Sequence, residues 1–166
     1  MSWPLTPSQT VGPFFGVGLP YEGGDKVVAP DSDGALRLEG QVLDGNGEPV
    51  SDGLIEIWEP TLGFGRHRTD SEGGFSLVIA KPRPAPGLDG RPQAPHLNVT
   101  VFARGLLRHL VTRIYFPDEM RANAEDPVLT LVDPARRSTL IARDDGGVLR
   151  FDIRLQGEQE TVFFVI

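Results

Sequence analysis

The chain has 166 residues, a net charge of −7 and no cysteine. Its length suits one domain that builds its own core. The negative charge argues against nucleic acid and anionic membranes as main partners. The absence of cysteine excludes disulfides, thiolate metal sites and a cysteine nucleophile.

Residues 1–34 are rich in proline, glycine and aspartate, and we expect them to form an extended arm. A long ordered arm needs a surface to lie against, for which a partner subunit is one candidate. The first residues do not show the basic and apolar pattern of a signal peptide, and no apolar run reaches the ~18 residues of a membrane helix. We therefore expect a soluble, cytoplasmic protein without membrane contact.

The regular part of the chain begins with strand patterns separated by turn signals. Residues 36–42 alternate apolar and polar side chains, and Asp44–Gly47 is a typical turn sequence. Within the next strand, 54–58, we expect Trp58 to pack in the core and Glu56 to face water or an interface. Further strands are predicted over residues 75–79, 97–103 and 109–116.

The remaining segments complete the predicted fold. Residues 81–95 hold five prolines and are expected to form a loop, whereas residues 117–124 read as a short helix with Pro117 in its first turn. The last strands are predicted over residues 139–142, 148–155 and 161–166. The pattern indicates an all-β fold, an antiparallel β-sandwich of about seven to nine strands over 35–166, preceded by the arm at 1–34.

His96-Leu97-Asn98 has the spacing of half a metal site. In a strand, side chains two residues apart share a face, so a His-x-His pair there can hold a metal ion. Here Asn98, a poor ligand, takes the second place, and the chain's other histidines are His67 and His109. The segment is therefore interpreted as a metal position that has lost its metal.

Several segments, in order, resemble the intradiol ring-cleavage dioxygenases. Thr6–Phe15 is similar to that family's amino-terminal arm, residues 44–58 to its first core hairpin, and Thr69–Gly73 to its next turn. Residues 94–98, 102–105, 112–116 and 151–158 are most similar to the alpha-type chains of two-chain members that cleave protocatechuate.

The resemblance implies that Fe(III) is held by a partner beta chain. In such beta chains two tyrosines and two histidines bind the iron, and this sequence matches that ligand set at His96 alone. Asn98 replaces the second histidine, the loop 81–95 has no tyrosine, and the segment carrying the other tyrosine is shortened around residues 60–66. We predict no metal and no complete catalytic site in this chain alone.

The resemblance also implies which residues contribute to the substrate pocket. By position, they are Thr10, Gly12, Pro13 and Phe14 of the arm, together with Arg104. Gly12 allows close backbone approach, and the Arg104 guanidinium would attract the substrate carboxylate. The expected assembly is an obligate alpha-beta hetero-oligomer that cleaves protocatechuate with O2 to 3-carboxy-cis,cis-muconate.

Two other hypotheses remain open. The chain could be a stand-alone binding or scaffold protein on the same fold. It could also be an independent ring-cleaving enzyme with another metal, whose binding would then depend on His96. For the residues outside the pocket, a structural role is expected for Arg113 and His109, and a solvated one for His67, while Arg136 and Arg137 are expected at the surface or an interface.

Overall fold

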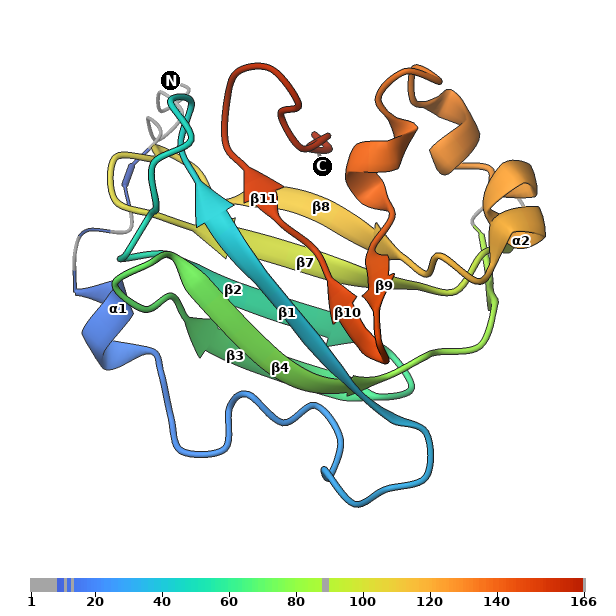
Figure 1. Cartoon of the computed structure of the whole chain (residues 1–166), viewed down its shortest axis with the longest axis horizontal. Coiled ribbons are helices and arrows are strands. Elements are labelled where there is room, and N and C mark those ends of the chain that lie inside the picture. The colour runs from blue at the N-terminus through green and yellow to red at the C-terminus, as the bar shows by residue number, and fades with distance from the viewer. Residues whose placement is uncertain (1–8, 11, 13, 88–89, 166) are drawn as a thin grey trace, which may run out of the picture.

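Two β-sheets lie face to face in the computed structural model, which describes residues 9–10, 12, 14–87 and 90–165 (Figure 1). The first sheet centres on β1 (Ala35–Leu43), which pairs antiparallel with β4 (Gly74–Ala80) on one side. On its other side β1 pairs in parallel with two short strands, β10 (Val148–Arg150) and β11 (Ile153–Arg154), and β9 (Arg143–Asp145) pairs with β10. The sandwich fold is confirmed, with two parallel pairings inside an otherwise antiparallel arrangement.

The second sheet has the order β3-β2-β7-β8 and is antiparallel throughout. Its strands are β2 (Leu54–Glu59), β3 (Gly63–Arg68), β7 (His96–Phe102) and β8 (Leu110–Tyr115). A short hairpin lies within the predicted loop 81–95, and its two strands, β5 (Ala85–Pro86) and β6 (Pro92–Gln93), have two residues each.

The core lies between the two sheets. Alternate side chains of the longer strands point inward, as the period of two requires, so that Leu38, Ile57, Leu77 and Val99 are fully buried. A smaller cluster around Tyr115, Leu129 and Leu140 joins the second sheet to the helical segments. These segments are α2 (Met120–Glu125), η1 (Leu129–Leu131) and η2 (Arg137–Leu140).

The segment before β1 contains α1 (Phe15–Gly18) and then crosses the open side of the sandwich. The Gly24 carbonyl accepts a hydrogen bond from Arg66 N of β3, while Asp25 and Val27 exchange backbone hydrogen bonds with Val78 of β4. This segment therefore links the free edges of the two sheets. The division into an arm over 1–34 and a sandwich over 35–166 stays a prediction.

Three predicted elements differ from the structure. Residues 137–140 form a 3₁₀-helix where 139–142 was expected to be a strand, because local hydrogen bonds such as Thr139 Oγ1 to the Arg136 carbonyl favour a turn. The predicted strand 148–155 is split at residues 151–152, and from 161–165 only Phe164 forms an isolated bridge, with Val111. The short helix is confirmed but begins at Met120, since Asp118 and Glu119 pair with Lys81 instead of entering its first turn.

Trp58 does not pack in the core. It lies on the same outer face as Glu56, because side chains two residues apart in a strand point the same way, and it is 52% exposed. None of the helices in the described part of the chain is long and apolar enough to cross a membrane.

Candidate functional site

The predicted pocket residues of the arm lie just before α1. Gly12 has φ of +76°, a conformation that favours glycine, and its N–H donates to Thr10 Oγ1 at 3.3 Å. Pro13 lies outside the described residues. Phe14 precedes the helix and is 73% exposed, so its ring is available for contact with another surface.

Arg104 is brought to the same end of the second sheet as the arm. The ring of Phe15, directly after Phe14, is buried and lies 6.5 Å from the ring of Phe102 at the end of β7. Arg104 follows two residues later, and Gly105 takes a φ of +90° that turns the chain away. The Arg104 side chain is 72% exposed, and its Nε forms an ion pair with Asp52 Oδ2 at 3.0 Å.

His96 and Asn98 lie at the opposite end of β7 from Arg104. The six residue steps between His96 and Phe102 span about 20 Å of extended strand. The predicted vestigial metal position and the predicted pocket residues are therefore two separate places in this chain. Their separation fits a chain whose arm and Arg104 serve a site that another chain completes.

His96 is held by local contacts in a largely buried place. Its Nδ1 lies 2.8 Å from the Ala94 carbonyl oxygen, which makes this nitrogen the hydrogen-bond donor, and its ring is 5.7 Å from that of Tyr115. Burial lowers the pKa of His96, so the imidazole is stabilised in its neutral form. Asn98 Nδ2 donates to the Trp58 carbonyl at 3.3 Å.

Beside His96 lies a buried polar network that the sequence did not reveal. The fully buried Asp126 accepts hydrogen bonds from Tyr115 Oη at 3.0 Å and from the backbone N–H of Ala94, Val128 and Leu129. Arg113 Nη1 donates to Tyr115 Oη at 3.3 Å and to Gln93 Oε1 at 2.8 Å. Asp126 thus joins the β6–β7 connection, β8 and η1 at this end of the sheet, and the structural role of Arg113 stays a prediction that these contacts support.

These residues do not offer a ligand set that fits a ferric ion. Burial raises the pKa of Tyr115, whose hydroxyl already donates to Asp126, so the phenol is stabilised in its protonated form and not as a phenolate. Tyr21 lies elsewhere, with its ring about 6.0 Å from the Arg66 guanidinium. Among the described residues, no three His, Cys, Asp or Glu side chains gather closely enough to hold a metal ion.

The other two histidines have ordinary surroundings. His67 of β3 faces the open side of the sandwich and is half-buried, so the prediction that it is solvated was wrong. Burial lowers the pKa of His67, whereas the nearby carboxylates of Asp25 and Asp70 act in the opposite direction. The His109 ring lies 5.6 Å from that of Phe102. Neither histidine lies near His96.

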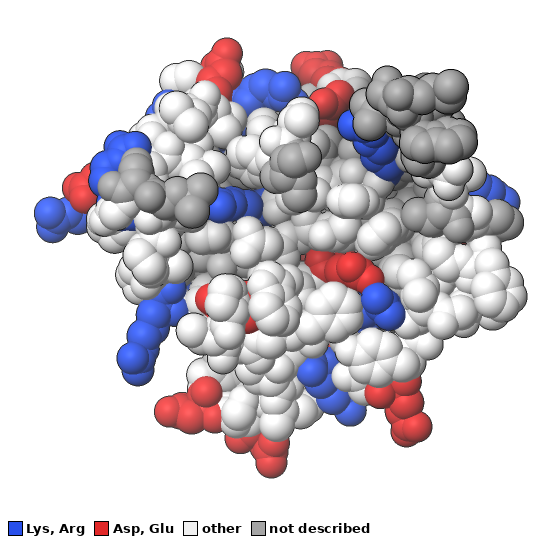
Figure 2. Space-filling view, turned by 180° about the vertical axis from the view of Figure 1, so that it is seen from behind, with Lys and Arg blue, Asp and Glu red and all other residues white. Residues whose placement is uncertain are grey.

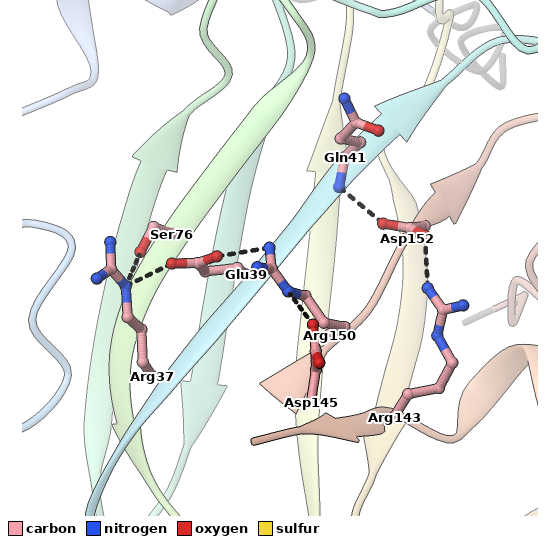
Figure 3. A network of polar contacts seen from close by, with 8 residues as sticks. All are labelled: Arg37, Glu39, Gln41, Ser76, Arg143, Asp145, Arg150 and Asp152. Atoms are coloured by element: carbon pink, nitrogen blue, oxygen red, sulfur yellow. Dashed lines mark hydrogen bonds and ion pairs between the residues drawn. The ribbon is translucent and has the colours of Figure 1, made fainter. Parts of the chain in front are cut away.

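A hollow of about 720 Å³ lies on the other side of the molecule, lined mainly by charged side chains. There Glu39 of β1 pairs with Arg37 and Arg150, and Asp152 accepts hydrogen bonds from Arg143 and from Gln41 N (Figure 3). The guanidinium and carboxylate groups in Figure 3 point toward one another across the outer face of the first sheet. Because these groups are paired with each other, they do not converge on an empty point where a ligand would bind.

Comparisons with known proteins agree with the geometry. No family model matches the chain. The fold is shared with solved dioxygenases. One is the dioxygenase domain of a carbohydrate-binding fusion protein from Streptomyces sp. SirexAA-E, with a TM-score of 0.62 and 26% identity over 80% of this chain and 87% of that one. Another is catechol 1,2-dioxygenase from Pseudomonas arvilla C-1, with a TM-score of 0.56 and 24% identity over 81% of this chain and 56% of that one. The fold is thus that of the intradiol dioxygenases, whose enzymes depend on non-haem iron.

Curated relatives narrow this class to one type of chain. A protocatechuate 3,4-dioxygenase alpha chain from Pseudomonas putida is 42% identical over 97% of this chain and 96% of that protein, and one from Burkholderia cepacia is 41% identical over 96% of each. A protocatechuate 3,4-dioxygenase beta chain from Burkholderia cepacia is 31% identical over 76% of this chain and 66% of that protein. The chain belongs to the family of protocatechuate 3,4-dioxygenase alpha chains.

Proposed function

We propose that this chain is the alpha subunit of an intradiol dioxygenase that cleaves protocatechuate. A beta chain would hold the Fe(III), and the assembled enzyme would break the ring bond between the two hydroxyl-bearing carbons. Both atoms of O2 enter the product, 3-carboxy-cis,cis-muconate. The observation that carries this proposal is the 42% identity over nearly the whole length to a protein with this named role.

Within this proposal, the chain supplies positive charge to the pocket through Arg104. Protocatechuate carries a carboxylate, and a guanidinium can bind a carboxylate with two parallel hydrogen bonds. Arg104 is exposed at the end of β7, where a second chain can meet it. Its contribution is to attract and orient the anionic substrate, not to take part in the bond changes.

The arm would form a wall of the same pocket. Gly12 lets the backbone approach the substrate closely, Thr10 offers a hydroxyl, and Pro13 and Phe14 offer apolar surface. Phe15, buried against Phe102, fixes this segment near the end of β7 and thus near Arg104. This arrangement supports a single pocket edge built from the arm and the β7–β8 loop.

The outer face of the second sheet is the surface we assign to the beta chain. Trp58 and Phe64 are opposite one another on β2 and β3 and are both exposed, and Tyr21 of the arm lies beside them over Arg66. Figure 2 shows the side of the molecule that faces away from the viewer in Figure 1. Uncharged side chains cover most of the middle of this side, around a small charged group. Exposed aromatic side chains are typical of the centres of subunit interfaces.

The test is co-expression with a beta-type chain, followed by purification through a tag on this chain alone. The purified material is analysed for iron, visible absorbance and O2 uptake with protocatechuate, and each chain is then analysed separately. We expect a coloured, active complex whose iron stays with the beta chain. If this chain is purified without a partner, colourless and inactive, the scaffold hypothesis replaces the proposal. If it binds iron and turns over protocatechuate alone, the division of labour is wrong. The cytoplasmic location stays a prediction.

A further inference from the structure

Asp52 lies on a turn whose position is fixed from within the protein. The buried Thr69 hydroxyl accepts a hydrogen bond from Gly53 N at 2.8 Å and donates to the Val50 carbonyl at 2.7 Å. Thr69 N in addition donates to the Gly53 carbonyl at 2.9 Å. These bonds hold both ends of the short turn that contains Asp52, so its backbone has little freedom.

The carboxylate on this turn contacts Arg104 at one particular nitrogen. Asp52 Oδ2 lies 3.0 Å from Arg104 Nε, the nitrogen nearest to the backbone, and the Asp52 side chain is only 26% exposed. Within the described part of the chain, the two terminal nitrogens of Arg104 have no hydrogen-bond partner. Those two nitrogens form the planar end of the guanidinium that matches a carboxylate.

Another arginine pair of the same chain shows the contrast. Arg121 and Glu125 pair at 3.4 Å along α2, and both side chains are largely exposed, at 93% and 71%. Two mobile side chains of this kind do not fix each other's direction. The pair of Asp52 and Arg104 differs because Asp52 is partly buried and lies on a turn that hydrogen bonds to Thr69 hold in place.

We propose that Asp52 is a positioning residue for substrate binding. Its carboxylate holds Arg104 at Nε, so that the terminal nitrogens are presented to the carboxylate of the aromatic substrate in the assembled enzyme. This inference rests on the proposed function of Arg104. It adds that the direction of the guanidinium, and not only its charge, contributes to binding.

The test uses Asp52→Asn in the purified complex with the beta chain. The substitution keeps the size of the side chain but removes its charge. If Asp52 positions Arg104, the KM for protocatechuate rises about five-fold while kcat stays within two-fold. If Asp52 merely neutralises Arg104, removing its negative charge strengthens attraction of the anionic substrate and KM falls, which overturns the proposal.

Two comparisons separate positioning from a general structural effect. The inhibition constant of 4-hydroxybenzoate, which has a carboxylate, should rise in Asp52→Asn, whereas that of phenol should not. In an Arg104→Ala background, Asp52→Asn should have no further effect on KM, because the group that it positions is absent. An equal effect on both inhibitors, or an undiminished effect without Arg104, overturns the inference.

The controls distinguish failure of this inference from failure of the proposed function. Glu125→Ala removes the acidic partner of another arginine and should leave KM unchanged. If Arg104→Ala itself leaves KM unchanged in an intact complex, the pocket role of Arg104 is wrong and the inference with it. If Arg104→Ala raises KM and Asp52→Asn does not, only the role of Asp52 is wrong.

Discussion

The two outer faces of the sandwich differ in how their side chains are satisfied. On the first sheet, Glu39 forms ion pairs with two arginines and Asp152 with a third, so charged groups cover the face and pair with one another (Figure 3). On the second sheet the outward positions hold Trp58 and Phe64, which are opposite one another, and the largely buried ion pair of Glu56 and Arg66 lies beside them. The same fold thus presents one face suited to water and one that gains free energy when it is covered.

The two faces also differ in their relation to the arm. Arg66 donates through Nη1 to the Leu19 carbonyl at 2.8 Å, and its guanidinium lies 5.1 Å from the Phe64 ring centre. The outer face of the second sheet, which carries Trp58 and Phe64 and is called the aromatic face below, is therefore continuous with the segment that carries Thr10 and Phe14. Under the proposed function, partner contact and pocket formation would therefore both take place on this side of the molecule.

The largest expected effect is a loss of folding stability at the end of the second sheet that contains His96. Asp126→Ala removes a fully buried carboxylate and leaves four donors without their partner. We expect a loss of about 3–5 kcal/mol in the free energy of unfolding, because buried donors without an acceptor are costly. Urea unfolding of the purified chain measures it, and a loss below about 1 kcal/mol would contradict the role assigned to Asp126.

The second prediction compares the two faces directly. Trp58→Glu places a charge in the aromatic face and should weaken binding to the beta chain by at least ten-fold, as expected for an aromatic residue at the centre of an interface. Gln41→Glu places the same charge on the outer face of the first sheet and should leave binding unchanged. Titration of labelled beta chain measures both affinities. Equal effects of the two substitutions would remove the distinction between the faces.

The third prediction concerns the ion-pair network alone. Glu39→Gln removes the carboxylate that pairs with Arg37 and Arg150, whose side chains are exposed to solvent. Because such pairs are screened by water, we expect a loss of only about 1 kcal/mol in unfolding free energy, which salt should reduce further. Binding to the beta chain should not change. A loss as large as that of Asp126→Ala would show that this network supports the core.

The smallest expected effect is a pH dependence of stability. Burial lowers the pKa of both His67 and His96 from the ordinary value of 6.5, so the unfolded chain binds protons that the folded chain does not. Stability is then fully present above about pH 6.5 and decreases as the pH falls below it. Unfolding curves of His67→Asn at pH 7.5 and 5.5 should show a smaller decrease than the unsubstituted chain, and an unchanged decrease would contradict the contribution of His67.

Much of the fold could be predicted because its strands alternate apolar and polar residues. The strands at 36–42, 54–58 and 75–79 were placed to within a residue or two of β1, β2 and β4. No comparable alternation marks β3, since Gly63–Arg68 combines two glycines with three basic residues. It becomes a strand through its pairing with β2 and its hydrogen bond to Gly24.

The site was only partly accessible to sequence reasoning. The order of motifs indicated the family, and the comparisons confirm it, whereas the roles of Thr10, Gly12, Pro13, Phe14 and Arg104 stay predictions. The Asp126 network could not be seen, because its members are distant in sequence and meet only when α2 and η1 turn back toward β8. The contact between Asp52 and Arg104 could not be predicted for the same reason, because Asp52 lies 52 residues before Arg104 in the sequence but next to it in space.

The crossing of the arm over the open side of the sandwich sets an order of events during synthesis. The ribosome makes residues 24–27 before either of their partners, Arg66 and Val78, so these backbone groups have nothing native to bind when they emerge. Only after both sheet edges exist can the arm settle between them, since long-range contacts form late. A segment that leaves the ribosome before its partners is therefore among the last to reach its final position, and throughout that interval the growing chain presents two unprotected strand edges to its surroundings.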